Sequence, residues 1–382
     1  MTVQAKQSQT SATENSSPAA ASSSTAAATA SSAPPATRPA RKPVKCLVWD
    51  LDDTLWVGIL LEGGAKTLRP GAEALVKALD ARGILLSIAS RNEPEVALAR
   101  LQDFGLAEYF LAPQIGWGAK STSVAHVAEA LNIGINALAF IDDQPFERDE
   151  VAATHPEVLV LDPEDLSALI DHPALVPTFL TEDSRNRRAM YQADQQRKDE
   201  EDRFDGPAEE FLAGLNMRLS IHPAREDDLL RAEELTKRTN QLNTTGETFD
   251  LDELRAFAKD PEHLLLMAGL EDRYGSYGKI GLSLVHKTPE AWTIRLLLMS
   301  CRVMSRGVGA ILINDLRDRA RAAHVRLLAD FVQTDRNRMM YVTFKFNNFR
   351  DIGHTEGRIH LENDLSEQRT PPDYVVVDSS WS

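Results

Sequence analysis

Three apolar runs in the first half of the chain each stop at a polar residue: Val44 to Trp49 before Asp50, Ile84 to Ala89 before Ser90, and Ala137 to Ile141 before Asp142. Runs of this length are typical of strands buried on both faces of a parallel sheet. Amphipathic stretches at Ala72 to Arg82 and Lys120 to Leu131 separate them and predict helices. This alternation predicts an α/β domain, a parallel sheet with helices on both faces.

The pattern changes in the second half of the chain. Three strand-type runs follow one another, at His263 to Leu270, Tyr277 to His286 and Trp292 to Met299, with helical patterns before and after them. Strands grouped in this way, with flanking helices, predict an α+β domain. Beyond Phe349 the chain is polar apart from Tyr374 to Val377, where we expect a last edge strand.

Two segments of unusual composition divide the chain. Residues 1–43 are mostly Ala, Ser, Thr and Pro, so they cannot bury enough apolar surface to offset their ordering entropy and are predicted to be disordered. Residues 181–205 are dense in charge and predict a solvated helical linker. The predicted domains are therefore 44–180 and 206–382.

Charge and hydropathy narrow the classes of function. The chain of 382 residues has a net charge of −15, which disfavours free nucleic acid and anionic membranes as partners. No apolar run approaches the roughly 20 residues that cross a bilayer. The two cysteines do not make a disulfide framework, and we expect a cytoplasmic protein.

Acidic side chains gather where the predicted strands end. Asp50 and Asp52 follow the first run, and Asp142 and Asp143 follow the third. In open α/β sheets the carboxyl ends of the strands share one edge, and ligands bind there. An acidic surface loop would explain the first pair alone, and helix capping would explain the second pair. Asn92, just after the second run, is expected to cap the next helix.

Together with Thr54, Ser90 and Lys120, these carboxylates resemble the four motifs of the haloacid dehalogenase (HAD) superfamily of phosphotransferases. The resemblance implies that Asp50 attacks phosphorus and that Asp52 acts as acid and base. It also implies a Mg²⁺ ion held by oxygen ligands. The remaining roles are phosphate binding by Thr54, Ser90 and Lys120, and metal binding by Asp50, Asp142, Asp143 and the main-chain carbonyl of Asp52.

The spacing of these motifs leaves no room for a cap domain. Asp50 and Ser90 are 40 residues apart, and Ser90 and Lys120 are 30 apart. A capless site is poorly closed to water, so it fits a substrate that is large or is shielded by another domain.

Longer stretches resemble one capless subgroup, the FkbH-like proteins of polyketide pathways. They are KCLVWDLDDTLW, SIASRNEP, WGAKS and FIDDQPFER in the first half, and LTKRTNQLN, DRYGSYGKIG and LLMSCRVMSRGVG in the second. The resemblance spans Val44 to Phe349, with Asp53 where the family more often has Asn. It implies a glyceryl transferase/phosphatase that loads a glyceryl unit from 1,3-bisphosphoglycerate, or a similar phosphorylated small molecule, onto an acyl carrier protein.

By the same resemblance, Pro207 to Phe349 looks like an acyltransferase domain of the GNAT type. Arg302 and Arg306 lie between a predicted strand and a predicted helix, where main-chain N–H groups and positive charge suit the phosphate of a phosphopantetheine arm. Four further polar residues either bind the glyceryl unit or the carrier arm, or cap helices: Arg238, Asn240, Asn243 and Asn337.

Cys301 is the candidate nucleophile of the second domain. It ends a predicted strand beside Arg302, and a neighbouring cation raises the thiolate fraction of a cysteine. A thiolate can displace phosphate from an acyl phosphate and form a thioester. We expect this thiol to face the pocket of Asp50. The alternative is a buried structural cysteine, which is our interpretation of Cys46 in mid-strand.

The stretch from Ala291 to Arg350 is basic, with eleven Arg or Lys against four Asp. It either steers an acidic carrier protein or forms ordinary solvated helix faces. Two other functions compete with glyceryl transfer. One is a plain small-molecule phosphatase with an attached binding domain, and the other is a non-catalytic scaffold that docks carrier proteins.

Overall fold

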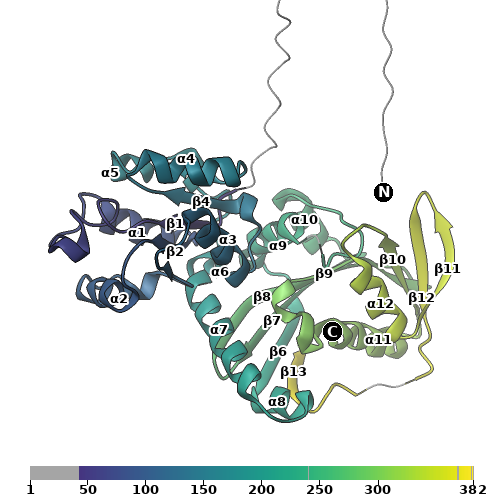
Figure 1. Ribbon diagram of the computed structural model, residues 1–382. Helices are drawn as coiled ribbons and strands as arrows, with labels where there is room; N and C mark the ends of the chain where they lie inside the picture. Colours follow the sequence, from purple (N-terminus) through teal and green to yellow (C-terminus); the bar gives the residue numbers. More distant parts are fainter. Residues whose placement is uncertain (1–42, 240, 368–369, 380, 382) are drawn as a thin grey trace, which may run out of the picture. The chain divides into compact units, whose positions relative to one another are not determined.

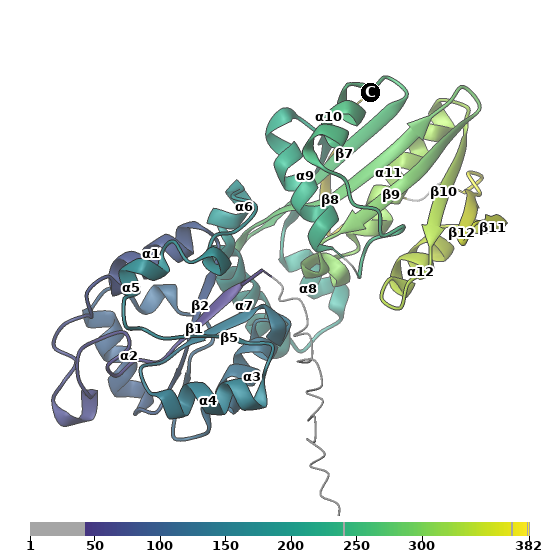
Figure 2. The same ribbon diagram turned by 90° about the horizontal axis from the view of Figure 1, so that it is seen from above.

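The computed structural model describes residues 43–239, 241–367, 370–379 and 381. These residues form two β-sheets, each covered by helices (Figures 1 and 2). The predicted disorder of residues 1–43 lies outside the described residues except for residue 43, and Asn240 also lies outside them. No described helix is long and apolar enough to cross a membrane.

The first sheet has, within the described residues, five parallel strands in the order β3-β2-β1-β4-β5. The strands are β1 (Cys46–Trp49), β2 (Leu85–Ser90), β3 (Gln114–Ile115), β4 (Leu138–Ile141) and β5 (Leu159–Leu161). Trp49 at the end of β1 is level with Ile88 and Ile141 on the neighbouring strands. The N–H of Asp50 donates to the carbonyl of Ile141 at 2.9 Å. The residues that follow β1 and β4 therefore begin side by side at the carboxyl edge.

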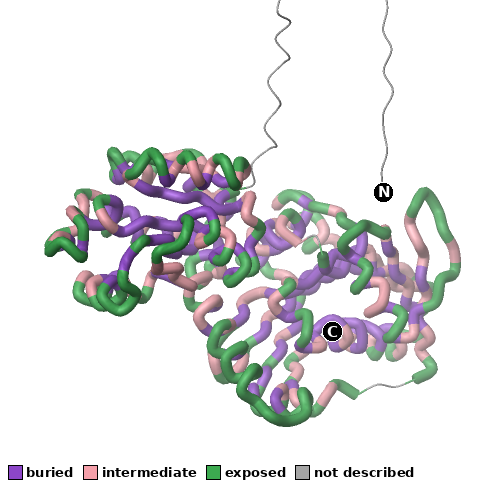
Figure 3. Tube along the Cα trace, in the orientation of Figure 1, coloured by how far each residue is buried: buried purple, intermediate pink, exposed green. Residues whose placement is uncertain are grey.

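Helices cover both faces of this sheet, as the sequence predicts. They are α1 (Ala72–Ala81), α2 (Pro94–Asp103), α3 (Lys120–Ala130), α4 (Pro145–Thr154) and α5 (Leu166–Leu169). Leu47 and Trp49 of β1 pack in one core with α1 and α2, whereas Cys46 and Val48 pack in a second core with α3 and α4. Successive strand residues point to opposite faces, so one short strand contributes to both cores. Figure 3 shows the central strands of this sheet, β1, β2 and β4, as buried.

The second sheet has eight strands among the described residues, in the order β11-β12-β10-β9-β8-β7-β6-β13. Their bounds are β6 (Met217–Pro223), β7 (His263–Asp272), β8 (Gly275–Lys287), β9 (Ala291–Met299), β10 (Arg326–Val332), β11 (Phe349–Thr355), β12 (Arg358–Asn363) and β13 (Val375–Ser379). The pairing is antiparallel except between β9 and β10 and between β6 and β13. The expected edge strand near residue 375 is confirmed.

Helices of the second sheet also lie on two faces. They are α8 (Ala208–Gly214), α9 (Glu226–Arg238), α10 (Leu251–Lys259), α11 (Val308–Ala322) and α12 (Arg338–Phe346). Apolar residues of α9 and α10 share one core with the sheet, and those of α8, α11 and α12 share another. Grouped strands with flanking helices are the α+β arrangement that the sequence predicts.

Strands β9 and β10 run parallel but pair only as far as Ile294 and Ala329. Beyond that point the main chain of Thr244 lies between them. Its N–H donates to the carbonyl of Leu297 at 3.0 Å, and its carbonyl accepts from the N–H of Val332 at 2.9 Å. A loop from elsewhere in the chain thus bridges the gap between the two strands.

The hairpin of β11 and β12 is missing from the sequence prediction, which has the chain beyond Phe349 as a polar tail. The two strands are joined by Glu356 and Gly357, whose φ angles are 52° and 80°. Two consecutive positive φ angles are typical of the tight turns that favour hairpins. Most residues of β11 are exposed, so the strand lacks the alternation of apolar and polar residues on which the prediction depends.

The charged segment 181–205 is helical, as predicted, but it is not wholly solvated. It forms α6 (Glu182–Arg185) and α7 (Arg187–Arg203). Arg197 is only 2% exposed, because its guanidinium pairs with Asp272 at 2.7 Å and lies 3.7 Å from the ring centroid of Tyr277. Arg188 pairs with Asp80 of α1 at 2.9 Å. The segment is therefore packed and ion-paired as far as Arg197, whereas residues 198–205 are exposed.

Candidate functional site

The candidate active site begins with three charged side chains that the first sheet brings together. Asp50 directly follows β1, Asp142 directly follows the adjacent β4, and Lys120 is the first residue of α3. The Nζ of Lys120 donates to Oδ1 of Asp50, and to Oδ2 of Asp142 at 2.7 Å. All three side chains are buried. Three residues that are far apart in the sequence thus converge as predicted.

Asp143 and Thr54 complete the acidic edge. The hydroxyl of Thr54 donates to Oδ1 of Asp143 at 3.2 Å and accepts from its N–H at 3.0 Å. Asp50, Asp142 and Asp143 each offer a carboxylate oxygen, and these oxygens lie within 4.8 Å of one another. Hard cations such as Mg²⁺ prefer carboxylate oxygens, so the three aspartates have the right donor atoms for the predicted metal.

The electrostatics of this cluster also fit a bound cation. Burial raises the pKa of Asp50, and the adjacent charge of Asp142 adds to this, whereas Lys120 lowers it. Burial and Asp142 likewise raise the pKa of Asp143. The charges of Asp50 and Asp142 raise the pKa of Lys120 against the effect of burial, so the lysine stays charged. One lysine among three carboxylates leaves the cluster short of positive charge, which a divalent cation would supply.

Ser90 lies at the same edge of the sheet. It is the last residue of β2, the strand next to β1, and it is buried. Its carbonyl accepts from the N–H of Gly116, which fixes the start of the loop that leads to Lys120. Ser90 therefore lies at the sheet edge that also carries Asp50 and Asp142.

Asp52 is held by three hydrogen bonds to its carboxylate. Trp56 Nε1 donates at 2.7 Å, the N–H of Leu60 at 3.0 Å and Asn92 Nδ2 at 2.9 Å. The predicted role of Asn92 as a helix cap is wrong, because Glu93 occupies the cap position of α2 without a side-chain bond. The buried amide of Asn92 instead orients Asp52. In the sequence, the sign of this role was the position of Asn92 just after β2, at the edge of the sheet where ligands bind.

Arg148 is a second residue that the sequence analysis did not single out. Its Nη1 donates to the main-chain carbonyls of Asp142 and Asp143, at 2.7 and 2.8 Å. Its Nη2 pairs with Asp162 at 2.6 Å. Arg148 therefore holds the turn that carries two of the three candidate metal ligands.

Large apolar side chains are exposed on the loops around this edge. Trp117, three residues before Lys120, is 65% exposed, and Phe146, near the start of α4, is 72% exposed. Val57, Ile59 and Leu61, on the loop after Asp52, are also exposed. Exposed apolar groups that cluster around a site are typical of surfaces that contact another molecule.

Cys301 lies elsewhere. It begins a 3₁₀ turn (Cys301–Arg306) directly after β9, is exposed, and lines a cavity of about 300 Å³. Lys45 and Leu85, at the amino ends of β1 and β2, line the same cavity. Because Asp50 follows the carboxyl end of β1, the two sites are about 16 Å apart along the strand. The expectation that this thiol faces the pocket of Asp50 is therefore wrong. The mid-strand Cys46 is buried, as predicted.

The other candidate residues of the second domain fall into two groups. Arg238 and Arg302 line the cavity of Cys301. Arg306 is buried and pairs with Glu201 of α7 at 3.1 Å, which turns its charge toward the linker helix instead of a ligand at the start of α11. There is also little space in front of the first turn of that helix. A Cβ on Gly307 would lie 2.8 Å from the hydroxyl oxygen of Tyr374.

Asn243 and Asn337 are buried and bonded to the main chain. Asn243 Oδ1 accepts from the N–H groups of Thr245 and Gly246, at 3.1 and 2.8 Å. Asn337 Nδ2 donates to the carbonyls of Asn243 and Val332, both at 2.9 Å. The alternative of helix capping is wrong for both side chains, because Asn337 occupies the N-cap position of α12 without a side-chain bond and Asn243 bonds within a loop. Both asparagines instead stabilise local backbone structure.

No family model matches the chain, and no curated protein matches it. Among solved structures, it is similar to the N-terminal part of a Bacteroides fragilis protein that contains a phosphatase domain complexed with Mg. The identity is 26%, the match covers 35% of this chain and 39% of that one, and the TM-score is 0.30. The chain thus spans well under half of the length of that structure.

Other similar structures include N-acetyltransferases. The ribosomal-protein-S18-alanine N-acetyltransferase from Escherichia coli is 11% identical, over 41% of this chain and 97% of that one, with a TM-score of 0.32. A putative phosphinothricin N-acetyltransferase is 18% identical, over 39% and 99%, with a TM-score of 0.29. The strand orders above confirm the predicted architecture: a parallel-sheet α/β domain followed by an α+β domain.

Proposed function

We propose that this chain is a glyceryl transferase/phosphatase: it takes a glyceryl unit from 1,3-bisphosphoglycerate or a similar phosphorylated donor, removes phosphate and loads an acyl carrier protein. The observation that supports this most is the buried contact of Lys120 with Asp50 and Asp142, beside Asp143 and the restrained Asp52. An attacking carboxylate, a positioned proton carrier and a lysine for phosphoryl oxygens are the groups that phosphate-ester hydrolysis requires.

In the phosphatase step, a carboxylate oxygen of Asp50 attacks phosphorus, and the bond from phosphorus to the glyceryl oxygen breaks. Asp52 gives its proton to that leaving oxygen and then takes one from the water that hydrolyses the aspartyl phosphate. Lys120 and Ser90 bind the transferred phosphoryl oxygens. A Mg²⁺ ion held by Asp50, Asp142, Asp143 and the carbonyl of Asp52 would add positive charge at those oxygens.

In the transfer step, the thiolate of Cys301 attacks the acyl carbon of the donor. The bond from that carbon to the phosphate oxygen breaks, and inorganic phosphate leaves with the electron pair; the thiol proton passes to solvent. A carrier thiol then attacks the same carbon and releases Cys301. The cavity of Cys301 is lined by Lys45 at the amino end of β1, whereas Asp50 follows its carboxyl end. This separation favours removal of the phosphate ester after the glyceryl unit has moved to the carrier arm.

The main experiment mixes the protein with 1,3-bisphosphoglycerate and an acyl carrier protein, and follows both proteins by intact mass. A glyceryl adduct on enzyme and carrier is the expected result. Phosphate release without any adduct would favour a plain phosphatase with an attached binding domain. No reaction at all would favour the docking scaffold.

Replacing the proposed nucleophile, Cys301→Ser, should reduce carrier loading at least about 10³-fold, because an alcohol at neutral pH is a far weaker nucleophile than a thiolate. The measurement is the initial rate of adduct formation on the carrier. Met304→Ala, an exposed position in the same turn, is the matched control and should load normally. Full loading by Cys301→Ser would remove this cysteine from the mechanism.

The variant Asn92→Ala should lower kcat about tenfold to a hundredfold, because Asp52 loses a bond that orients its carboxylate. The loss should be larger with glycerol phosphate than with p-nitrophenyl phosphate, since nitrophenolate leaves without a proton. Gln102→Ala, on an exposed part of α2, is the control. Equal losses with both substrates would argue against a proton-transfer role for Asp52.

A further inference from the structure

The cavity beside Cys301 is strongly basic. It has a volume of about 300 Å³ and lies among α7, α9 and the turn after β9. Among its lining residues Glu234 is the one carboxylate, against these cations: Lys45, Arg187, Arg231, Arg238, Arg302 and Arg336. A concave site of this size suits a small molecule, and this lining suits an anionic one.

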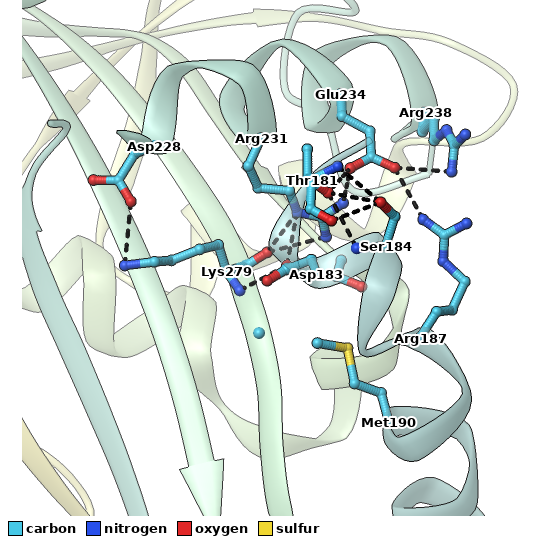
Figure 4. A network of polar contacts seen from close by, with 12 residues as sticks. Thr181, Asp183, Ser184, Arg187, Met190, Asp228, Arg231, Glu234, Arg238 and Lys279 are labelled. Carbon is cyan, nitrogen blue, oxygen red and sulfur yellow. Dashed lines mark hydrogen bonds and ion pairs between the residues drawn. The ribbon is translucent and has the colours of Figure 1, made fainter. Parts of the chain in front are cut away.

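Three of these arginines share a single buried glutamate (Figure 4). Glu234 pairs with Arg187 at 3.0 Å, with Arg231 at 2.7 Å and with Arg238 at 2.9 Å. Asp183 adds one more carboxylate, 2.8 Å from Arg231. Three guanidinium groups thus share two carboxylates, which leaves positive charge in excess before the other cations of the cavity are counted.

The crowding of these cations is reflected in their proton affinities. Burial and the nearby charge of Arg238 lower the pKa of Arg187 to about 10. Burial also lowers the pKa of Arg238, with Arg231 acting in the same direction. Like charges held together away from water are relieved by an added anion, so ligand binding would stabilise this arrangement.

Arg302 brings the positive charge next to the thiol. Its Nη1 lies 3.0 Å from the sulfur of Met190, and its Nε lies 3.5 Å from the hydroxyl of Ser300. Both hydrogen-bond partners are neutral, and a thioether is a weak acceptor. The carboxylate of Asp194 is close enough for Arg302 to oppose the rise that burial causes in its pKa, but no ion pair joins them, so this guanidinium keeps N–H donors for an anion. It directly follows Cys301 in the turn.

Tyr191 of α7 also lines the cavity. Burial raises the pKa of its phenol, and the charges of Arg302 and Arg187 oppose that rise. The phenol therefore lies in the same positive field as the ligand would, and it is a neutral hydrogen-bond donor at physiological pH. Arg187 and Tyr191 both come from the charged segment, which thus contributes to the site and does more than connect two domains.

We propose that this cavity binds the phosphate of a small acyl phosphate or phosphate ester through Arg187, Arg238 and Arg302, and so presents the acyl carbon to Cys301. This inference rests on the proposed glyceryl transfer for the role of the thiol. The anion site itself depends only on the charges and contacts around the cavity. It also explains why a cysteine on an exposed turn lies beside six cations.

The test uses the rate at which iodoacetamide alkylates Cys301, followed by intact mass and peptide mapping on the full chain. Buried Cys46 should stay unmodified and serve as an internal reference. Saturating 3-phosphoglycerate should slow alkylation of Cys301 at least about tenfold, and glycerate, which lacks the phosphate, should not slow it. Ionic strength is kept constant with chloride.

In Arg302→Gln the concentration of 3-phosphoglycerate that gives half protection should rise about tenfold, as expected when one charged hydrogen bond is lost. Arg187→Gln should raise this concentration by a similar factor. If Arg187→Gln does not fold, the result for Arg302→Gln decides between the outcomes, because the hydrogen-bond partners of Arg302 are neutral and its loss breaks no ion pair with them. Arg326→Gln, which removes an exposed pair with Glu362, is the control and should be protected like the wild type. Circular dichroism checks the fold of each variant.

The outcomes separate the two proposals. Equal protection by glycerate and 3-phosphoglycerate, or unchanged protection in Arg302→Gln, would overturn the anion site even if carrier loading is observed. Phosphate-dependent protection that weakens in the arginine variants supports the site. If no glyceryl adduct then forms with 1,3-bisphosphoglycerate, the proposed transfer is wrong and the anion site stands.

Discussion

Asp50→Asn should remain folded and release phosphate at a rate lower by on the order of 10⁴-fold or more, because the amide oxygen cannot replace the attacking carboxylate. Lys120 keeps Asp142 as a partner in this variant, so the cluster retains an ion pair. The measurement is release of inorganic phosphate from glycerol phosphate with added Mg²⁺, together with a thermal unfolding curve.

Asp53→Asn is the matched control for this experiment. It makes the same chemical change three residues along the chain, at an exposed side chain whose Oδ1 accepts from the N–H of Gly58. The φ angle of Asp53 is 51°, and asparagine tolerates this region as well as aspartate does. The control should release phosphate normally. Unchanged release by Asp50→Asn would show that the first domain does not work through an aspartyl phosphate.

Lys120→Met should cost about 3–5 kcal/mol of unfolding free energy, because it leaves Asp50 and Asp142 buried next to each other without their shared cation. The variant should also abolish phosphate release, because it lacks the ammonium group proposed to bind the transferred phosphoryl oxygens. The measurement is urea unfolding, with EDTA present so that no divalent cation substitutes for the lysine.

Lys77→Met is the control for stability. It removes an exposed lysine that pairs with Glu73 one helical turn away, and such pairs contribute little. Its unfolding midpoint should not move. If Lys120→Met is as stable as this control in EDTA, the contacts of Lys120 with Asp50 and Asp142 are not significant in the folded protein.

The convergence of Asp50, Ser90, Lys120 and Asp142 could be predicted because it follows from one rule of parallel sheets. Each residue ends, follows or begins an element whose type is clear from its apolar pattern, and the carboxyl ends of parallel strands share an edge. Asn92 was missed for a local reason. Its type favours helix capping just before a proline, and only the folded structure shows that Asp52 takes its amide.

Charge along the sequence was a poorer guide than apolar pattern. Arg197 stands in a run of charged residues that is typical of a solvated helix, yet its partner Asp272 lies 75 residues away at the end of β7. The cavity beside Cys301 is lined by residues that make contacts of this kind, between Glu234 and the arginines of α7 and α9. Side chains that meet across long stretches of chain leave no periodic signal, so neither the cavity nor its distance from Asp50 could be predicted.

The bridge that Thr244 makes between β9 and β10 limits how a thiol-bearing arm can approach Cys301. The amide groups of such an arm could lie along β9 as an additional strand only by displacing the main chain of Thr244, whose bonds to Leu297 and Val332 occupy those positions. This part of the edge of β9 is therefore already paired and is not open to an added strand. Under the proposed function, a carrier arm that reaches Cys301 would be recognised without strand-type pairing to β9 at this position.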